Sequence, residues 1–224
     1  MIHYHGTPIT PRSKLLEMKG RHFCVSFANP QDIETCLKIG QSIMLDNGAF
    51  TAYTQGKILD KIKYFEWCEK YLSHPHWAVI PDVIGGTIEE QRSYMKDWPF
   101  PKDLSAPVWH LNLSLDWLQE LVDNYGKVCL GSSGEFWQIG IKKWEQRMDE
   151  IFEMLSKKRF MPWIHGMRML GQSNGRWPLA SADSTNVARN HSTRKIHPEI
   201  MAQKIDGIQP ERKWKPSPQL DLLK

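Results

Sequence analysis

Cysteine is scarce in this sequence and follows no metal-binding or disulfide pattern. The four residues contain no CxxC pair, and they are Cys24, Cys36, Cys68 and Cys129. Four scattered cysteines are not the pattern of a disulfide framework or of a structural zinc site. No apolar run approaches the roughly 20 residues that cross a bilayer, and the N-terminus lacks the basic and apolar blocks of a signal peptide. We therefore expect a cytoplasmic protein with no cofactor, no zinc subdomain and no membrane contact.

The composition is that of a soluble globular domain with an uneven charge distribution. The chain has 224 residues, of which 41% are hydrophobic and 24% charged, and its formal net charge is +4. Residues 187–224 hold eight Lys or Arg and four Asp or Glu, which accounts for the whole excess. A basic segment after a neutral body is typical of contact with nucleic acid. The alternative is a solvated tail that only keeps the protein soluble.

Short apolar runs alternate with stretches of helical spacing. The runs are Ile2–His5, His22–Ala28, Ser42–Asp46, Trp77–Asp82, Ala106–Asn112, Lys127–Ser132, Trp163–Met169 and Leu179–Asp183. The predicted helices are Ser13–Lys19, Pro30–Ile39, Leu59–Leu72, Thr87–Asp97, Leu115–Tyr125 and Lys142–Lys157. This order predicts βαβ units and a parallel sheet.

Eight such units predict an α/β fold, a compact (β/α)8 TIM-like barrel over residues 1–195. Leu170–Pro178 is too short and too rich in Gly and Asn for a full helix, so an irregular unit is expected there. Residues 196–224 are interrupted by proline and predict a basic C-terminal extension. An open doubly wound sheet is the alternative fold, although the chain has neither GxGxxG nor GxxxxGK[ST] to support nucleotide binding there.

Polar residues end several of the predicted strands. Asp46, Asp82 and Asp183 each close an apolar run, and His110 and His165 lie near the ends of two others. Buried carboxylates are costly unless they are solvated, paired or used, and barrel active sites lie at the carboxyl ends of the strands. The three aspartates together therefore predict a functional cluster rather than three helix caps.

Two chemistries fit these residues. In one, a carboxylate attacks a sugar carbon while a second carboxylate transfers protons. In the other, a divalent metal that activates water is bound by a larger set, namely His3, His5, His110, His165 and Asp183. His3 and His5 alternate along the first strand and would both face inward, unless they are strand histidines bonded to carbonyls or water.

Four segments, in the same order along the chain, resemble the tRNA-guanine transglycosylase superfamily. Residues 46–50 (DNGAF) resemble its DSGGF segment, and residues 131–135 (GSSGE) resemble its glycine-rich GGLAVGE strand end. Residues 165–167 (HGM) fall at its LMG strand, and Asp183 with residues 188–190 (ARN) resembles its nucleophile segment DCVLPTRN. The resemblance covers roughly residues 42–190.

The resemblance implies a role for each matching residue. Asp183 would attack C1′ of a nucleotide and expel guanine, and Asp46 would serve as acid and base. The expected base-binding residues are Asp82, Asn47, Phe50, His110, Gly131, Ser132 and His165, with Phe50 and His165 on either face of the ring. Phosphates would be held by Arg189, Arg194 and Lys195, and Arg12 in the first strand-to-helix loop is a further candidate.

The chain departs from the familiar tRNA enzymes in its length. It has no cysteine after Cys129, so we expect no counterpart of their C-terminal zinc subdomain. The short form resembles phage enzymes that insert queuosine-like 7-deazaguanine bases into DNA, which would place it in the host cytoplasm. DNA is therefore expected over tRNA as substrate, with a free 7-deazaguanine base as co-substrate. A homodimer or an accessory protein would supply missing nucleic-acid surface, and a non-catalytic nucleic-acid-binding barrel remains an alternative.

Overall fold

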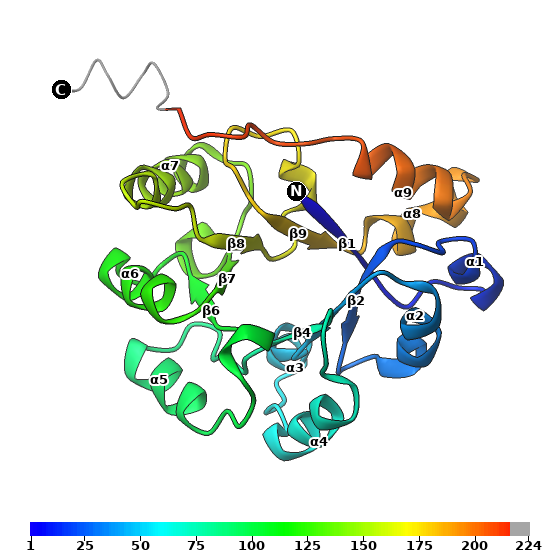
Figure 1. The fold of residues 1–224 in the computed structure, drawn as a ribbon, viewed down its shortest axis with the longest axis horizontal. Coiled ribbons are helices and arrows are strands. Elements are labelled where there is room, and N and C mark those ends of the chain that lie inside the picture. The colour runs from blue at the N-terminus through cyan, green and yellow to red at the C-terminus, as the bar shows by residue number, and fades with distance from the viewer. Residues whose placement is uncertain (216–224) are drawn as a thin grey trace.

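The computed structural model describes residues 1–215 and shows an α/β fold in which helices surround a central parallel sheet (Figure 1). Within these residues the sheet has nine strands, in the order β5-β4-β3-β2-β1-β9-β8-β7-β6. The strands are β1 Ile2–Gly6, β2 His22–Ser26, β3 Ile43–Asp46, β4 Trp77–Val79, β5 Ser105–Ala106, β6 Val108–His110, β7 Lys127–Gly131, β8 Trp163–Gly166 and β9 Ser181–Ser184. The predicted parallel α/β architecture is confirmed.

The sheet curls until its two edges almost meet. The edge strands β5 and β6 are consecutive in the chain and are separated only by Pro107. Proline has no backbone N–H and therefore interrupts a ladder of hydrogen bonds. The Pro107 carbonyl nevertheless accepts a hydrogen bond of 2.9 Å from the Cys129 backbone N–H. The result is a nearly closed, barrel-like sheet of the TIM type.

The helices form the outer layer. They are α1 Arg12–Leu16, α2 Ile33–Ile39, α3 Ala49–Thr54, α4 Lys61–Tyr71, α5 Ile88–Lys96, α6 Leu115–Asn124, α7 Lys142–Ser156, α8 Asn186–Arg194 and α9 Pro198–Asp206. Side-chain caps fix several starts, for example Ser114 at α6 and a capping box of Thr87 and Glu90 at α5. Across residues 1–215, every helix is too short or too polar to cross a bilayer.

Side chains alternate between the interior of the sheet and the helical layer. The interior is filled by Tyr4, Cys24, Met44, Trp77, Val79, Ala106, Val108 and Cys129. Their neighbours along the same strands, such as Phe23, Leu45 and Leu130, pack outward against the helices. This alternation is the normal geometry of a strand, and it decides which polar residues near each strand end face inward.

The connection between β8 and β9 lacks a full helix, as its composition predicts. Only the short 3₁₀ turn η4, Leu170–Gln172, lies between these strands. The segment that follows α9 covers this part of the barrel instead (Figure 1). The Glu211 backbone N–H donates to the Gly175 carbonyl at 3.2 Å, and the Trp214 indole N–H donates to Glu153 of α7 at 3.2 Å.

The expectation of a C-terminal extension from residue 196 needs correction for its first part. Residues 198–206 form α9, and Pro198, Met201 and Ala202 are buried in the outer core. Proline at the start of this segment begins a helix, because the first helical residue needs no N–H donor. Residues 196–206 therefore belong to the helical layer, whereas residues 216–224 of the expected extension lie outside the described residues.

Tyr64 of α4 ties together the ends of two strands that lead into the mouth of the barrel. Its buried hydroxyl lies 3.1 Å from the Leu45 carbonyl and 2.7 Å from the Val79 carbonyl. Leu45 directly precedes Asp46, so this contact fixes the position of the end of β3, and with it that of the Asp46 carboxylate. The link therefore joins the packing of α4 to the geometry of the candidate site.

Replacing Tyr64 by Phe should lower the free energy of unfolding by about 1–2 kcal/mol, because two buried carbonyls lose their shared donor. Urea denaturation measures the change. Tyr71→Phe is the matched control, since the Tyr71 hydroxyl donates to the exposed Glu34, and it should cost less than about 0.5 kcal/mol. Equal effects of the two variants would contradict the assigned role.

Candidate active site

Five ionisable side chains gather inside the carboxyl end of the sheet. Asp46 ends β3, Asp82 follows β4, His110 ends β6, His165 lies in β8 and Asp183 lies in β9. Asp46, His110, His165 and Asp183 have the inward phase of their strands, because their neighbours Leu45, Trp109, Ile164 and Ala182 belong to the outer core. Asp82 lies in the loop after β4 and reaches the group through His110, whose Nε2 is 2.8 Å from its Oδ2. Carboxyl ends of parallel strands form one face of a barrel, so these groups share one mouth.

Asp183 is held through one of its two carboxylate oxygens. Oδ1 accepts a hydrogen bond of 2.7 Å from the Arg168 backbone N–H and lies 3.2 Å from His165 Nε2. No hydrogen bond from residues 1–215 reaches Oδ2. The carboxylate is therefore fixed in orientation while one oxygen stays free to react.

The proton on His165 can be placed from its neighbours. Its Nδ1 lies 2.8 Å from the Ser181 hydroxyl oxygen, which also accepts a hydrogen bond of 2.9 Å from the Trp163 indole N–H. The Ser181 hydroxyl proton is then free to bond Nδ1, so that the Nε2–H of the imidazole donates to Asp183. Trp163, Ser181 and His165 form a chain that orients the carboxylate.

Asp82 is held by two neighbours, one on each oxygen. The Asn47 amide donates to Oδ1 at 2.8 Å, and His110 Nε2 lies 2.8 Å from Oδ2. The other ring nitrogen of His110 lies 3.1 Å from the Ser133 hydroxyl oxygen, and that hydroxyl donates to Asn112 at 2.8 Å. Both ends of the imidazole are engaged, which fixes its plane and the position of Asp82.

Gly131 makes room for this arrangement. A Cβ atom at this position would lie 3.0 Å from His110 Nδ1 and 3.1 Å from a Val108 methyl carbon. Both distances are tighter than ordinary van der Waals contact. Glycine is therefore needed at the end of β7 for His110 to reach Asp82.

Asp46 occupies a tight turn between β3 and α3. The Gly48 backbone N–H donates to its Oδ2 at 3.2 Å, and Gly48 has a φ of +75°, which favours glycine. Burial raises the pKa of Asp46 from 3.8 to about 6. A hydrogen bond from Ser26 opposes this rise in the pKa, whereas the charges of Asp183 and Asp82 add to it. Asp46 can therefore hold or release a proton near neutral pH.

The charges of the three aspartates also act on the thiols of the barrel interior. Burial raises the pKa of the interior thiol of Cys129 well above its usual value, and the charges of Asp183, Asp82 and Asp46 raise it further. Cys24 on β2 has a raised pKa for the same reasons, burial first and then Asp183 and Asp46. Three carboxylates from distant parts of the chain thus act on the same interior.

Arg168 is a residue that the sequence did not single out. Its guanidinium lies 4.1 Å from the centre of the Phe50 ring. The two residues follow β8 and β3, which lie across the sheet from each other in the strand order, so this cation–π contact spans the mouth. Arg168 also has a φ of +59°, an unusual conformation that clusters at functional sites. Nothing in the residue types of this loop signals that conformation.

Three of the residues expected to bind the base lie away from an open surface. His165 is fully buried against Tyr4 and Trp77 and does not face Phe50, which is 48% exposed. Ser132 points outward and accepts a hydrogen bond from Trp144, whereas Ser133 points inward. Asn47 is 1% exposed, so it positions Asp82 from below. These residues shape the site without forming an open surface for a base.

The residues expected to bind a metal do not come together. His3 and His5 lie on the outward phase of β1 and meet Asp206 of α9, with His5 Nε2 at 2.9 Å from its Oδ1. Tyr4 between them fills the interior, so the inward phase assumed for both histidines is wrong. Within residues 1–215, no group of three or more His, Cys, Asp or Glu is arranged to hold a metal ion.

The predicted phosphate ligands are divided between two positions. Arg189 lies in the first turns of α8, which starts directly after β9, and Arg12 begins α1 after β1. Both therefore lie at the end of the barrel that carries the mouth. The Arg12 guanidinium donates to the Thr35 hydroxyl at 3.1 Å. Arg194 and Lys195 lie at the far end of α8 and are not brought to the mouth.

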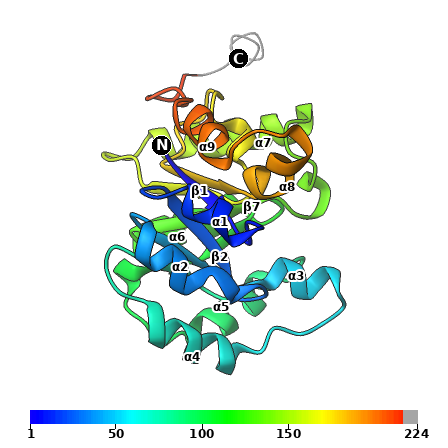
Figure 2. The same ribbon diagram turned by 90° about the vertical axis from the view of Figure 1, so that its right-hand side faces the viewer.

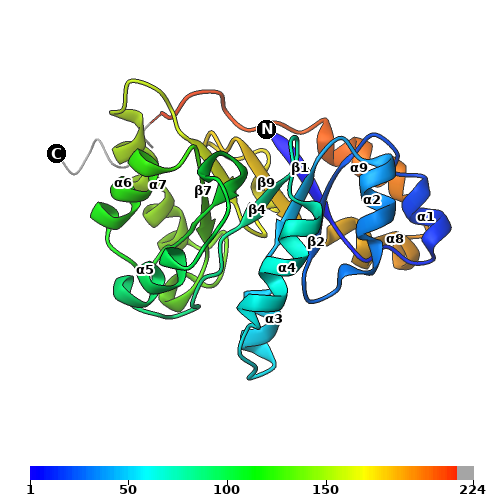
Figure 3. The same cartoon turned by 60° about the horizontal axis from the view of Figure 1, so that its bottom comes forward.

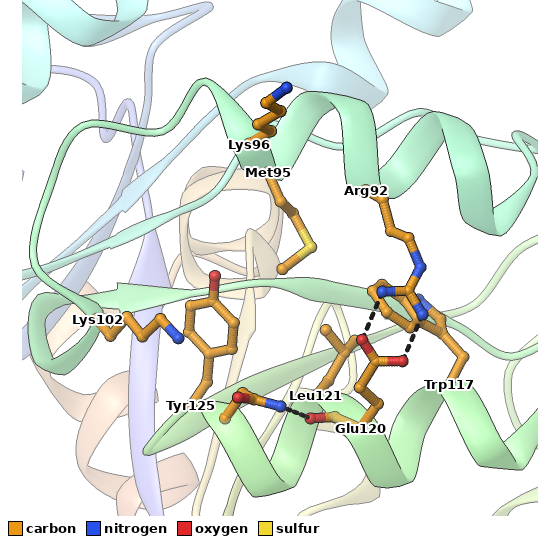
Figure 4. Close-up of a pocket in the computed structure, with 9 residues that line it drawn as sticks. Arg92, Met95, Lys96, Lys102, Trp117, Glu120, Leu121 and Tyr125 are labelled. Carbon is orange, nitrogen blue, oxygen red and sulfur yellow. Dashed lines mark hydrogen bonds and ion pairs between the residues drawn. The ribbon is translucent and has the colours of Figure 1, made fainter.

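A surface cavity of about 310 Å³ lies elsewhere, between α5 and α6 (Figure 4). Arg92 and Glu120 form an ion pair on one side, and Met95, Lys102 and Tyr125 line the other. None of the residues predicted from the sequence contributes to it. The chemistry of the mouth, rather than the size of this cavity, marks the candidate active site.

Comparison with known proteins does not add a family to this picture. No protein-family model, no curated protein and no solved structure matches the chain. The fold and the carboxylate cluster define an α/β barrel-like protein with a polar, partly desolvated mouth. The function is therefore argued from this geometry.

Replacing Asp46 by Asn should stabilise the protein at pH 7.5. Because the folded pKa of about 6 exceeds 3.8, the folded state binds more protons between these values, and stability falls as pH rises through this window. Removing the charge should therefore raise the free energy of unfolding by about 1–2 kcal/mol at pH 7.5 and hardly at all near pH 4.

Urea denaturation at the two pH values measures the effect of Asp46→Asn. Asp60→Asn is the control, because Asp60 is an exposed helix cap that asparagine replaces well. It should give no gain at pH 7.5. A loss of stability in Asp46→Asn at pH 7.5 would show that its carboxylate is not desolvated.

Proposed function

We propose that this protein is a base-exchange transglycosylase that replaces guanine in DNA with a 7-deazaguanine base. The observation that carries the proposal is the convergence of Asp46, Asp82 and Asp183 on one mouth, with Asp183 Oδ2 free and Asp46 able to exchange a proton. The resemblance of four ordered segments to guanine transglycosylases supports it. Counting β5 and β6 as one strand interrupted at Pro107, the proposed scaffold is a (β/α)8 barrel with eight units.

In the first half-reaction, Asp183 is the nucleophile. Oδ2 attacks C1′ of the deoxyribose, and the bond from C1′ to the guanine N9 breaks, leaving a covalent aspartyl-glycosyl intermediate. Hydrogen bonds from Arg168 and His165 to Oδ1 hold the attacking oxygen in line. Such preorganisation lowers the barrier because the carboxylate need not be ordered during the reaction.

Asp46 supplies and removes the proton. A purine leaves as an anion only with difficulty, so a nearby acid must protonate it as the bond breaks. In the second half-reaction, Asp46 takes the proton from the ring nitrogen of the incoming base, which then attacks C1′ and releases Asp183. Two carboxylates with different environments divide the roles of nucleophile and acid–base group, and the pKa of about 6 suits Asp46 to the second role.

Asp82 is the recognition group for the base. A carboxylate is an acceptor only, and the exposed edge of guanine offers N–H donors. His110 and Asn47 fix both Asp82 oxygens, and each oxygen keeps a lone pair for the base. Phe50, at 48% exposure, provides a ring face for stacking.

Radiolabelled guanine incorporation into DNA and RNA tests the proposal directly. Wild-type protein should exchange label into DNA, and Asp183→Asn should lower the rate by at least about a thousandfold, since the nucleophile is lost. A covalent protein–DNA adduct should be trapped with a 7-deazaguanine analogue in the wild type only. An absence of exchange into either polymer, or full activity in Asp183→Asn, would leave a non-catalytic nucleic-acid-binding protein as the better description.

His165 should act as a positioning residue in this reaction. His165→Phe removes the donor to Asp183 and should reduce kcat about ten- to a hundredfold while leaving the KM for the free base unchanged. His165→Gln keeps an N–H donor and should recover part of kcat. An effect confined to thermal stability in both variants would show that His165 only fills the interior.

A further inference from the structure

Three exposed aromatic side chains border the mouth on two sides. Phe50 and Tyr53 lie on α3 after β3, and they are 48% and 61% exposed. Trp137 follows β7 and is 71% exposed. Four strands separate β3 from β7 in the strand order, so the two lie on different sides of the mouth. The helix α3 projects away from the barrel (Figures 2 and 3). Exposed rings that gather around one mouth, rather than being scattered singly, mark a contact surface.

Cations lie along one arc of the same mouth. Lys142 starts α7 after β7, Arg168 follows β8, Arg189 lies in α8 after β9, and Arg12 starts α1 after β1. Within residues 1–215, none of these four is in an ion pair with a carboxylate, whereas Lys143 next to Lys142 is bound to Glu135. The strands β7, β8, β9 and β1 are consecutive in the sheet, so the four cations form a continuous arc.

Acidic residues lie on the rim as well. Glu89 and Glu90 lie in the first turn of α5, and Asp116 lies in the first turn of α6. These helices follow β4 and β6, whereas Glu135 follows β7 and Glu145 lies in the first turn of α7. The rim therefore carries both signs of charge, and what distinguishes the side from β7 to β1 is that its four cations have no carboxylate partner within residues 1–215.

We infer that the mouth binds single-stranded DNA across its width. Phosphates lie along the arc from Lys142 to Arg12, the bases flanking the target stack on Trp137 and Tyr53, and the target base turns inward toward Asp183. Exposed rings interleaved with cations are the usual means of binding single strands without reading sequence. A duplex would hide the target base in its stack. This inference rests on the proposed function and specifies its substrate as unpaired.

Fluorescence anisotropy with a labelled oligonucleotide tests the inference. The protein carries Asp183→Asn, so that binding is measured without reaction, and the ligands are one DNA sequence as a single strand and as a duplex, plus the same sequence as RNA. The single strand should bind at least about tenfold tighter than the duplex. Trp137→Ala and Tyr53→Ala should each weaken this binding about five- to fiftyfold.

Phe160→Ala is the matched control. Phe160 is 75% exposed but follows α7 at the opposite end of the barrel, so binding should not change. Equal affinity of Trp137→Ala and the parent, tighter binding of the duplex, or RNA bound as tightly as DNA would overturn the inference. Concentration-dependent self-association that Trp137→Ala abolishes would instead assign the rings to a protein contact.

The test separates this inference from the proposed function. Single-strand binding that depends on Trp137 and Tyr53, together with an absence of base exchange in the wild type, would leave the binding surface standing and remove the reaction. Base exchange that survives both substitutions at unchanged KM for DNA would keep the reaction and remove the binding surface.

Discussion

The site depends on keeping three carboxylates close together at the edge of a nonpolar interior. Each would repel the others and lose hydration, so each needs a compensating donor. Asp183 is bonded by the Arg168 backbone and His165, and Asp82 by Asn47 and His110. Asp46 has the weaker support of Gly48 and Ser26, and its pKa rises to about 6. Asp183 is therefore a carboxylate of fixed orientation, whereas Asp46 can gain or lose a proton near neutral pH.

The polar network beneath the mouth extends into the barrel. His165 packs against Tyr4 and Trp77, and the Trp77 indole N–H donates to the Tyr4 hydroxyl at 2.9 Å. Below the carboxylates, the rings of Tyr4 and Trp77 share the interior with aliphatic side chains such as Val79, which are the usual filling of such barrels. The interior thus holds the His165 imidazole rigidly. Packing around a residue that contacts a carboxylate also limits the movement of that carboxylate, here Asp183.

Much of the architecture could be predicted from the sequence, because apolar runs and helix signals alternate clearly. The ends of β3 and β9 at Asp46 and Asp183 were predicted from the same pattern. It was harder to predict whether each strand residue faces the interior or the helices. Strands that are covered on both faces are apolar throughout and show no period of two. His3 and His5 were given the wrong phase for this reason. The helices α3, α8 and α9 were not predicted; α3 follows a left-handed glycine turn, and α9 begins at a proline in a basic segment.

The pairing of β1 with β9 has a consequence for how the chain acquires its structure during synthesis. The strand β1 leaves the ribosome first, but it can pair with β9 only after this last strand has been synthesised. The outward histidines of β1 contact Asp206 of α9 later still. Nascent chains shorter than this length keep two open sheet edges, which favour pairing with other chains. The carboxylate mouth is therefore assembled only in the final stage of translation, when Asp183 and Asp46 first meet.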